Sequence, residues 1–288
     1  MGTVAVVTDT CHYLPRQLVA ARAIHEVSLY VHWDGRQDRE SDLPDYDAYY
    51  GHLRTARQMP TTSQPSIGDF LAVYEPLLAE GRDVVSIHLS GAISGTFASA
   101  TQARQQLVES GVDGERIRLL DSQSACGGEG LVVLAAHAAA ARGASAEEVV
   151  AHAQEARAAL KMWFAVDTLE YLRRGGRIGA AQAYLGSALK IKPILTLEAE
   201  ITPIERVRTS GRAFERMVDY MRQRHADGAD AWVVQHIQAP EEAARLVERG
   251  RELWGTDPCF VSEIGPVIGT HVGPGLLGVG GVPGRFLT

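Results

Sequence analysis

The sequence predicts an α/β protein: a parallel sheet with helices on both faces, followed by a second α/β unit. Short apolar runs alternate with segments whose apolar residues recur at helical spacing, which is typical of strands joined by crossover helices. The run at 84–89 is nearly all apolar, as expected of a strand covered on both faces. With 288 residues, 45% of them hydrophobic, the chain can bury the cores of one large or two moderate domains.

In the first half, each predicted strand is a short apolar run that ends in polar or turn residues: 4–7, 27–33, 84–89 and 117–120. The predicted helices have apolar residues at helical spacing or are rich in alanine: 43–59, 67–79, 94–108, 131–141 and 146–160. Asp9 follows the first strand at the end where open α/β sheets bind ligands, so it lies near a candidate site. Capping of a helix that begins near residues 14–15 explains Asp9 equally well.

In the second half, apolar runs predict strands at 162–166 and 232–236, and alternation predicts a hairpin over 195–208. Helices are expected over 169–174, 214–224 and 241–251. The glycine-rich tail at 265–284 is expected to form loop and strand at a tight interface, because glycine allows close backbone approach. We place the domain boundary near residue 160, which gives domains 1–160 and 161–288.

Composition excludes several classes of protein. The net charge of −7 argues against a nucleic-acid footprint and against an anionic membrane surface as the resting location. Three widely spaced cysteines suit reduced thiols, and Cys126 reads as a small packing residue. The N-terminal stretch lacks the features of a signal peptide, and eighteen apolar residues never run together. We therefore expect a cytoplasmic protein.

Two hydroxyl-rich stretches, Thr61-Thr62-Ser63 and Ser94-Gly95-Thr96, each stand before a predicted helix. Backbone amides at a helix start, together with the helix dipole, can hold an anion. We interpret the two stretches as converging on one small acidic group, with simple helix capping as the alternative. His271 in the tail could donate a hydrogen bond to that group or carry its counter-charge, although a lone histidine is more often structural.

Motifs for other chemistries are absent from the sequence: no G-x-S-x-G elbow, no zinc-ligand spacing and no nucleotide phosphate loop. Two basic groups remain. Arg173, Arg174 and Arg177 could hold a phosphate or an acidic partner, or could be a solvated helix end. Arg206 and Arg208, with Arg212 nearby, would share one face of a hairpin strand and form a docking surface, unless they serve only solubility.

Seven motifs occur in a characteristic order: VVTDT at 6–10, TTSQPS at 61–66, SGAISGTFASA at 90–100, DSQSACGGEGL at 121–131, DTLEYLRRGGRIG at 167–179, LKIKPIL at 189–195 and IGTHVGPGLLGV at 268–279. On these motifs the whole chain resembles the DegV family of bacterial fatty-acid-binding proteins, which includes the FakB-type subunits of fatty-acid kinase. The first motif departs from the family, since Thr10-Cys11-His12-Tyr13 replaces a serine and an aspartate before Leu-Pro.

The resemblance implies a long-chain fatty acid, such as palmitate, in a tunnel closed between domains 1–160 and 161–288. It implies that Thr62 and Ser94 hold the carboxylate and that His271 lies near it, with Ser63, Gly95 and Thr96 as further donors. It also implies no catalytic residue, cofactor or metal in this chain. A separate ATP-dependent kinase would dock near Arg206 and Arg208 and make the acyl phosphate for phospholipid synthesis, and transient membrane contact would allow ligand exchange.

Two alternatives stay open at this point. The chain could be a lipid-sensing regulator that acts through a partner protein. It could instead be an acyl hydrolase or transferase that uses Ser94 with His271, which the missing nucleophile elbow disfavours.

Overall fold

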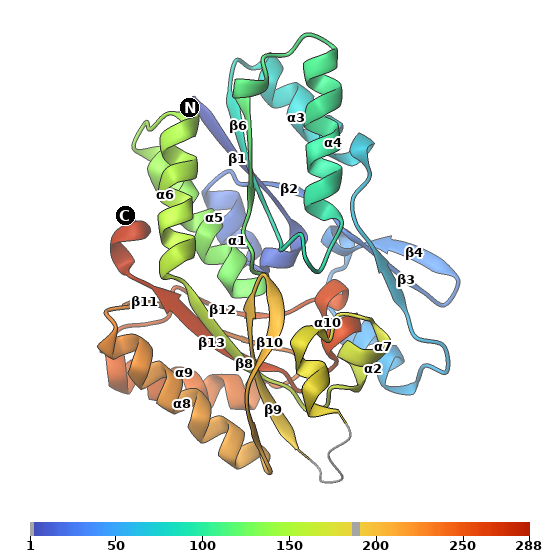
Figure 1. Ribbon diagram of the computed structural model, residues 1–288, viewed down its shortest axis with the longest axis vertical. Helices are drawn as coiled ribbons and strands as arrows, with labels where there is room; N and C mark the ends of the chain where they lie inside the picture. The colour runs from blue at the N-terminus through green and yellow to red at the C-terminus, as the bar shows by residue number, and fades with distance from the viewer. Residues whose placement is uncertain (1–2, 186–190) are drawn as a thin grey trace.

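The computed structural model describes residues 3–185 and 191–288, so Leu189 and Lys190 of the LKIKPIL motif lie outside the described residues. A parallel sheet in the order β2-β1-β6-β7 occupies the first half of the chain (Figure 1). Its strands are β1 (Val4–Asp9), β2 (His25–Val27), β6 (Asp83–His88) and β7 (Ile117–Asp121). Helices α3 (Ile67–Ala79) and α4 (Thr96–Glu109) cover one face, and α5 (Cys126–Ala141) and α6 (Ala146–Ala159) cover the other.

A mixed sheet in the order β10-β9-β8-β13-β11-β12 forms the second half, and most of its strand pairs are antiparallel. Its strands are β8 (Lys161–Ala165), β9 (Lys192–Glu198), β10 (Glu200–Val207), β11 (Ala231–His236), β12 (Phe260–Glu263) and β13 (Leu277–Val282). Helices α8 (Ser210–Ala226) and α9 (Pro240–Trp254) cover one face of this sheet.

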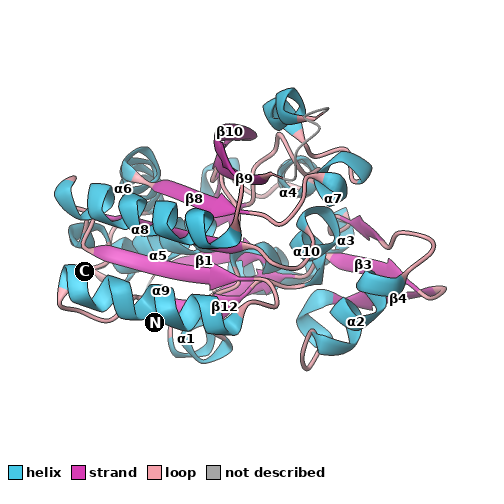
Figure 2. Ribbon diagram, turned by 90° about the horizontal axis from the view of Figure 1, so that it is seen from below, coloured by secondary structure: helices cyan, strands magenta, loops and turns pink. Residues whose placement is uncertain are grey.

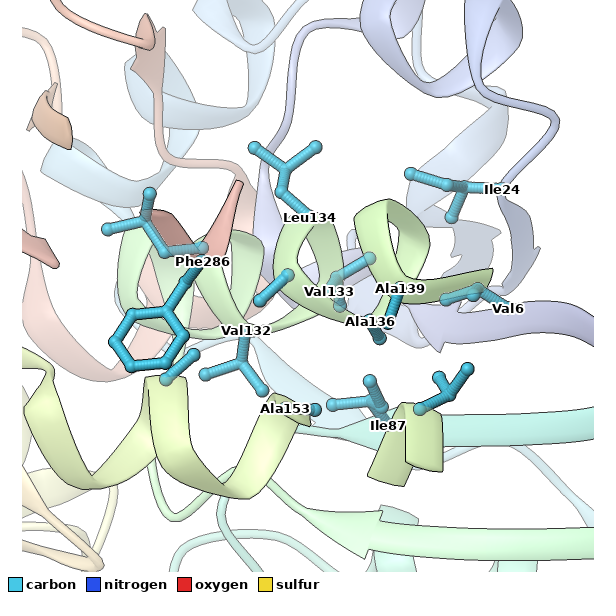
Figure 3. Packing of buried hydrophobic residues seen from close by; sticks show 14 of the residues in the cluster. Val6, Ile24, Ile87, Val132, Val133, Leu134, Ala136, Ala139, Ala153 and Phe286 are labelled. Atoms are coloured by element: carbon cyan, nitrogen blue, oxygen red, sulfur yellow. The ribbon is translucent and has the colours of Figure 1, made fainter. Parts of the chain in front are cut away.

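Helix α5 lies between the two sheets and belongs to the core of both. Thirteen of its sixteen residues are buried, although it is built mainly of alanine, glycine and valine. These small side chains let the backbone approach closely, and one apolar cluster joins β1 and β6 to β11, β12 and β13 through this helix. Figure 3 shows Val132, Val133 and Leu134 of α5 among the side chains of this cluster, with Ile87 from β6 on one side and Phe286 from the C-terminal end.

A three-stranded antiparallel sheet, β4-β3-β5, lies at one end of the molecule beside α2 and α10 (Figure 2). Its strands are β3 (Tyr30–Trp33), β4 (Arg36–Arg39) and β5 (Thr61–Ser63), and the helices are α2 (Asp47–Thr55) and α10 (Pro266–Val272). The β3–β4 turn is Asp34-Gly35, both at positive φ, as a tight hairpin requires. The remaining elements are α1 (Arg16–Ala21), α7 (Glu170–Arg174), η1 (Thr10–His12), η2 (Glu40–Asp42), η3 (Gly114–Arg116), η4 (Gly179–Tyr184) and η5 (Gly284–Phe286).

The predicted fold class is confirmed, and the helix predicted over 67–79 begins and ends where expected. Its start is set by a capping box between Ser66 and Asp69, and Gly81 supplies a positive φ just beyond its end. None of the helices within residues 3–185 and 191–288 is long and apolar enough to cross a membrane. The division into domains 1–160 and 161–288 stays a prediction, because α5 shares its core with both sheets.

Four predictions about local structure are wrong. The stretch Thr61–Ser63 does not open a helix: it pairs with β3 as an edge strand, and Ser66 starts α3. The run at 27–33 is two strands in two different sheets, since the chain leaves the parallel sheet after Val27. The helix expected at 43 begins only at Asp47, and the glycine-rich tail contains the helix α10. In each case long-range pairing or packing overrode the local pattern.

Candidate ligand cavity

A cavity lies where the two large sheets and the three-stranded sheet meet, and about 110 Å³ of it is open to the centre of a water molecule. Most of its wall is apolar: Leu29, Leu89, Ile93, Ala125, Met162, Phe164, Leu172, Leu197, Ile201, Ile264, Val267, Ile268, Val272 and Leu276. The wall is drawn from both halves of the chain, so neither half forms the cavity alone. Such a surface suits a hydrocarbon.

Thr62 and His271 meet in this wall. The hydroxyl of Thr62, on β5, lies 2.8 Å from Nε2 of His271, on α10, although the two residues are 209 positions apart. Ser94 lines the same cavity, in the loop before α4, and its hydroxyl contacts that of Thr96 at 2.9 Å. The loop after β5 reaches the start of α4, because a Cβ on Gly95 would lie 2.8 Å from the side-chain amide of Gln64.

His271 is held as a neutral ring. Burial, with a smaller effect of the Arg177 charge, lowers the pKa of His271 to about 4. Nδ1 has no hydrogen-bond partner among the described residues, which favours the tautomer that carries its proton on Nε2 and donates to Thr62. The Thr62 hydroxyl then keeps its own proton for an acceptor in the cavity. A neutral ring acts as a donor and positioning group rather than as a counter-charge.

The ring of His271 fits because Gly175 has no side chain. A Cβ on Gly175 would lie 2.3 Å from Nδ1, well inside contact distance. Gly175 follows α7, so this close approach ties α7 to α10 beside the polar residues of the cavity.

Arg177 brings a positive charge to this group. Its Nε donates to the carbonyl of Ile93 at 3.3 Å and one terminal nitrogen donates to the carbonyl of Gly175 at 2.7 Å. Arg177 lines the cavity and two adjoining surface hollows, one next to Ser94 and one next to Thr62. The exposed side chain of Arg177 therefore supplies positive potential where the cavity meets solvent.

A buried carboxyl group, that of Glu40, anchors helix α10. Glu40 is 2% exposed and accepts hydrogen bonds from the amide of Val267 at 2.8 Å, the Thr10 hydroxyl at 2.8 Å and the Tyr13 hydroxyl at 2.9 Å. Burial nevertheless raises the pKa of Glu40 to about 7. Because Val267 and His271 lie on one short helix, this anchor also fixes the imidazole.

The loop that carries Ser94 is anchored by Asp9. This carboxylate, at the end of β1, is fully buried and accepts from the amides of Cys11 and Leu89 at 2.9 Å and 3.0 Å. The ring of His88 also contacts it at 3.1 Å. Asp9 therefore caps η1 and holds the first residue after β6, and it does not line the cavity. The predicted helix cap was the better interpretation, although the capped element is η1 rather than a helix at 14–15.

The structure brings four of the six predicted site residues to the cavity wall: Thr62, Ser63, Ser94 and His271. Gly95 lines the neighbouring hollow beside Ser94, and Thr96 is buried behind it. The Ser63 hydroxyl contacts His32 Nε2 at 2.9 Å, so one of its hydrogen bonds is already made within the protein. Within the described ranges no hydrogen bond joins Ser94 to His271, so the pair needed for an acyl hydrolase is not formed.

Sequence reasoning missed several lining residues. Arg177 was grouped with Arg173 and Arg174, whose side chains instead pair with Glu170 on the surface of α7. Gln64 lines the cavity but was not among the predicted site residues. Its place in the TTSQPS motif, directly after Thr62 and Ser63, could have indicated it. Ser124 stands in the DSQSACGGEGL motif and was likewise not singled out. Gln235 had no signal in the sequence, because only the packing of the sheets brings it to the wall.

The second basic group lies outside the cavity. Arg206 and Arg208 are exposed at the end of β10, on the edge of the six-stranded sheet, and Arg206 lies over the ring of Tyr184 at 5.6 Å. Ile204, on the same strand, is 41% exposed. Among the described residues this surface is exposed, and its role as a docking site stays a prediction.

Comparison with known proteins gives consistent matches over almost the whole chain. The model of an uncharacterised protein family, DegV, matches residues 3–284. Protein DegV of Bacillus subtilis is 36% identical over 279 residues, covering 96% of this chain and 98% of that protein. The structure of that protein, described as fatty-acid-binding, superposes with a TM-score of 0.86 at 35% identity over 97% of this chain and 99% of its own. A DegV family protein from Thermus thermophilus, whose structure is described in terms of fatty-acid binding, also has a TM-score of 0.86, at 34% identity over 98% of this chain and 100% of its own.

Proposed function

Because the chain belongs to the DegV family, we propose that it binds one long-chain fatty acid, with the acyl chain in the cavity and the carboxylate at Thr62 and Ser94. The observation that carries the proposal is the composition of the cavity wall: mostly apolar side chains, with the hydroxyl groups of Thr62 and Ser94 and a neutral histidine among them. The two solved relatives described as fatty-acid-binding support the choice of ligand.

The acyl chain supplies most of the affinity. Burial of a CH₂ group is worth about 0.8 kcal/mol, so the fifteen or so carbon units of palmitate contribute roughly 12 kcal/mol before the costs of association and ordering. The carboxylate adds little net affinity, since it leaves water to enter the protein. Its hydrogen bonds set which end of the ligand faces the mouth of the cavity.

Two hydroxyl groups can donate hydrogen bonds to the carboxylate, and two sources of positive potential favour its charge. The hydroxyl proton of Thr62 is available because His271 donates to its oxygen, and the Ser94 hydroxyl stands at the start of α4. The positive end of the α4 dipole favours an anion there. Arg177, which lines the hollows on both sides, lowers the electrostatic cost of bringing a negative charge to this place.

The same proposal includes what happens to the bound acid. A carboxylate at the mouth of the cavity is accessible to a second protein, and this chain has no nucleotide-phosphate motif with which to activate it. We therefore assign the phosphorylation step to a separate ATP-dependent kinase that docks at Arg206 and Arg208 and forms the acyl phosphate. A regulator that only senses the lipid would bind the acid equally well without that step.

Denaturing mass spectrometry of the protein purified from bacteria tests ligand binding directly. We expect a released long-chain fatty acid, and protein that arrives empty and also refuses added palmitate would contradict the proposal. The head-group assignment is tested by Thr62→Ala combined with Ser94→Ala, for which we expect an affinity loss of roughly tenfold or more. Thr61→Ala is the matched control, because Thr61 is exposed on the same strand and does not line the cavity. Unchanged affinity in the double variant would remove Thr62 and Ser94 from the site.

A further inference from the structure

Ser124 has a hydroxyl group that the fold leaves without a partner. It lies in the loop between β7 and α5, is 1% exposed and lines the cavity. Its backbone groups are used: the amide donates to Ser122 Oγ at 3.2 Å, and the carbonyl accepts from the amide of Ser90 at 2.8 Å. Oγ itself has no hydrogen-bond partner among residues 3–185 and 191–288. Leaving a buried hydroxyl unpaired costs about 1–3 kcal/mol, so a partner is expected.

The register of the six-stranded sheet gives the position of Ser124 along the cavity wall. Leu276, which directly precedes β13, and Gly278 on β13 line the cavity, and Gly280 pairs with Met162 on β8. Gly280 lies four residues beyond Leu276, about 13 Å in extended chain. The Leu276 end adjoins α7 and α10, which meet at Gly175 and His271.

Ser124 stands at the Met162 end. A Cβ built on Gly128 would lie 2.1 Å from Ser124 Oγ and 3.1 Å from Met162 Cγ, so both side chains fill the space that this glycine leaves. The hydroxyl therefore lies beside Met162 in the cavity wall.

A second polar group faces the same region. Gln235 on β11 lines the cavity and is 1% exposed. Its side-chain oxygen accepts from the amide of Gly127, and its nitrogen donates to Ser262 Oγ at 2.8 Å. These two bonds hold the amide in place and leave it one further proton. Gln235 pairs with Gly278, which puts it between Leu276 and the Met162 end.

We infer that Ser124 and Gln235 form a second polar subsite in the part of the cavity beside Met162, which accepts a fatty acid whose chain carries a hydroxyl group. This inference rests on the proposed fatty-acid function. A hydroxyl on the chain could accept from Gln235 and exchange hydrogen bonds with Ser124, whereas a plain hydrocarbon leaves the serine unpaired. The subsite thus selects by the position of the oxygen along the chain.

The test compares stearate with a series of hydroxystearates that differ only in the position of the hydroxyl group. We expect the protein to bind at least one isomer at least as tightly as stearate, and Ser124→Ala to weaken that isomer roughly tenfold. The same substitution should leave stearate affinity unchanged or slightly raised, because it removes an unpaired hydroxyl. Ser99→Ala is the matched control: it removes a buried hydroxyl from α4 that does not line the cavity.

Thermal melting of Ser124→Ala shows whether the variant is folded, and its retained stearate binding is the internal check. If the protein binds stearate and every isomer with affinities that Ser124→Ala does not change, the inference is wrong and a buried water is the partner of Ser124. If the protein binds no fatty acid at all, the proposed function fails first. The two failures are therefore distinguishable.

Discussion

Substitution of Gly175 by alanine should disturb the polar end of the cavity and leave the rest of the fold intact. The backbone at Gly175 has φ −75° and ψ −7°, which alanine adopts without strain. The added Cβ would nevertheless lie 2.3 Å from His271 Nδ1 and 3.3 Å from Cγ. Ordinary contacts begin near 3.4 Å, so the ring must move by about an ångström.

That movement breaks the contact between His271 and Thr62, which is 2.8 Å long. Loss of a hydrogen bond in a buried site leaves a polar group unpaired and costs about 1–3 kcal/mol. We therefore expect Gly175→Ala to weaken binding of palmitate by roughly 5- to 150-fold. Because the tail still supplies most of the affinity, binding should be reduced rather than abolished.

Displacement of a fluorescent fatty acid measures this loss, and thermal unfolding shows whether the variant is folded. Gly211→Ala is the control, because a Cβ there meets nothing within 4 Å. A folded Gly175→Ala variant that binds palmitate as tightly as the wild type would refute the role of the imidazole at the head group.

Three further predictions concern stability and docking. Glu40→Gln should change the pH dependence of stability. Because the pKa of Glu40 is raised to about 7 in the folded protein, protonated Glu40 contributes stability below pH 4.5 that is lost as pH rises through 7. In denaturant titrations the wild type should therefore lose about 3 kcal/mol of unfolding free energy relative to the variant between pH 4 and pH 8. A pH-independent difference would show that Glu40 titrates normally. Gly250→Ala places a Cβ 2.3 Å from the ring of Trp232 and should lower the free energy of unfolding by about 1–3 kcal/mol, and an unchanged melting temperature would contradict this packing. Reversal of charge at Arg206 and Arg208 should leave palmitate affinity unchanged while kinase-dependent acyl phosphate formation falls roughly tenfold, and equal loss in both assays would argue against a docking role.

Sequence reasoning performed well where a local rule decides the structure. The helix α3 has an amphipathic pattern and a glycine beyond its end, and these two signals agree with the observed helix. The hairpin at Ala199 and the alternation of strands and helices in the first half were also predicted correctly. The same local rule failed at Thr61–Ser63, because three hydroxyl residues fit a helix start and an edge strand equally well.

The sequence by itself determined the α/β character, with helices on both faces of a parallel sheet, and the placing of hydroxyl groups near strand ends, because propensity and hydrophobic period act over a few residues. Only the tertiary structure decided that Thr62 meets His271 across 209 positions, that Glu40 anchors α10, and that Ser124 faces the cavity. Those contacts depend on how α5 packs between two sheets and on strand register. Both are settled by burial summed over the whole chain, which no short segment encodes.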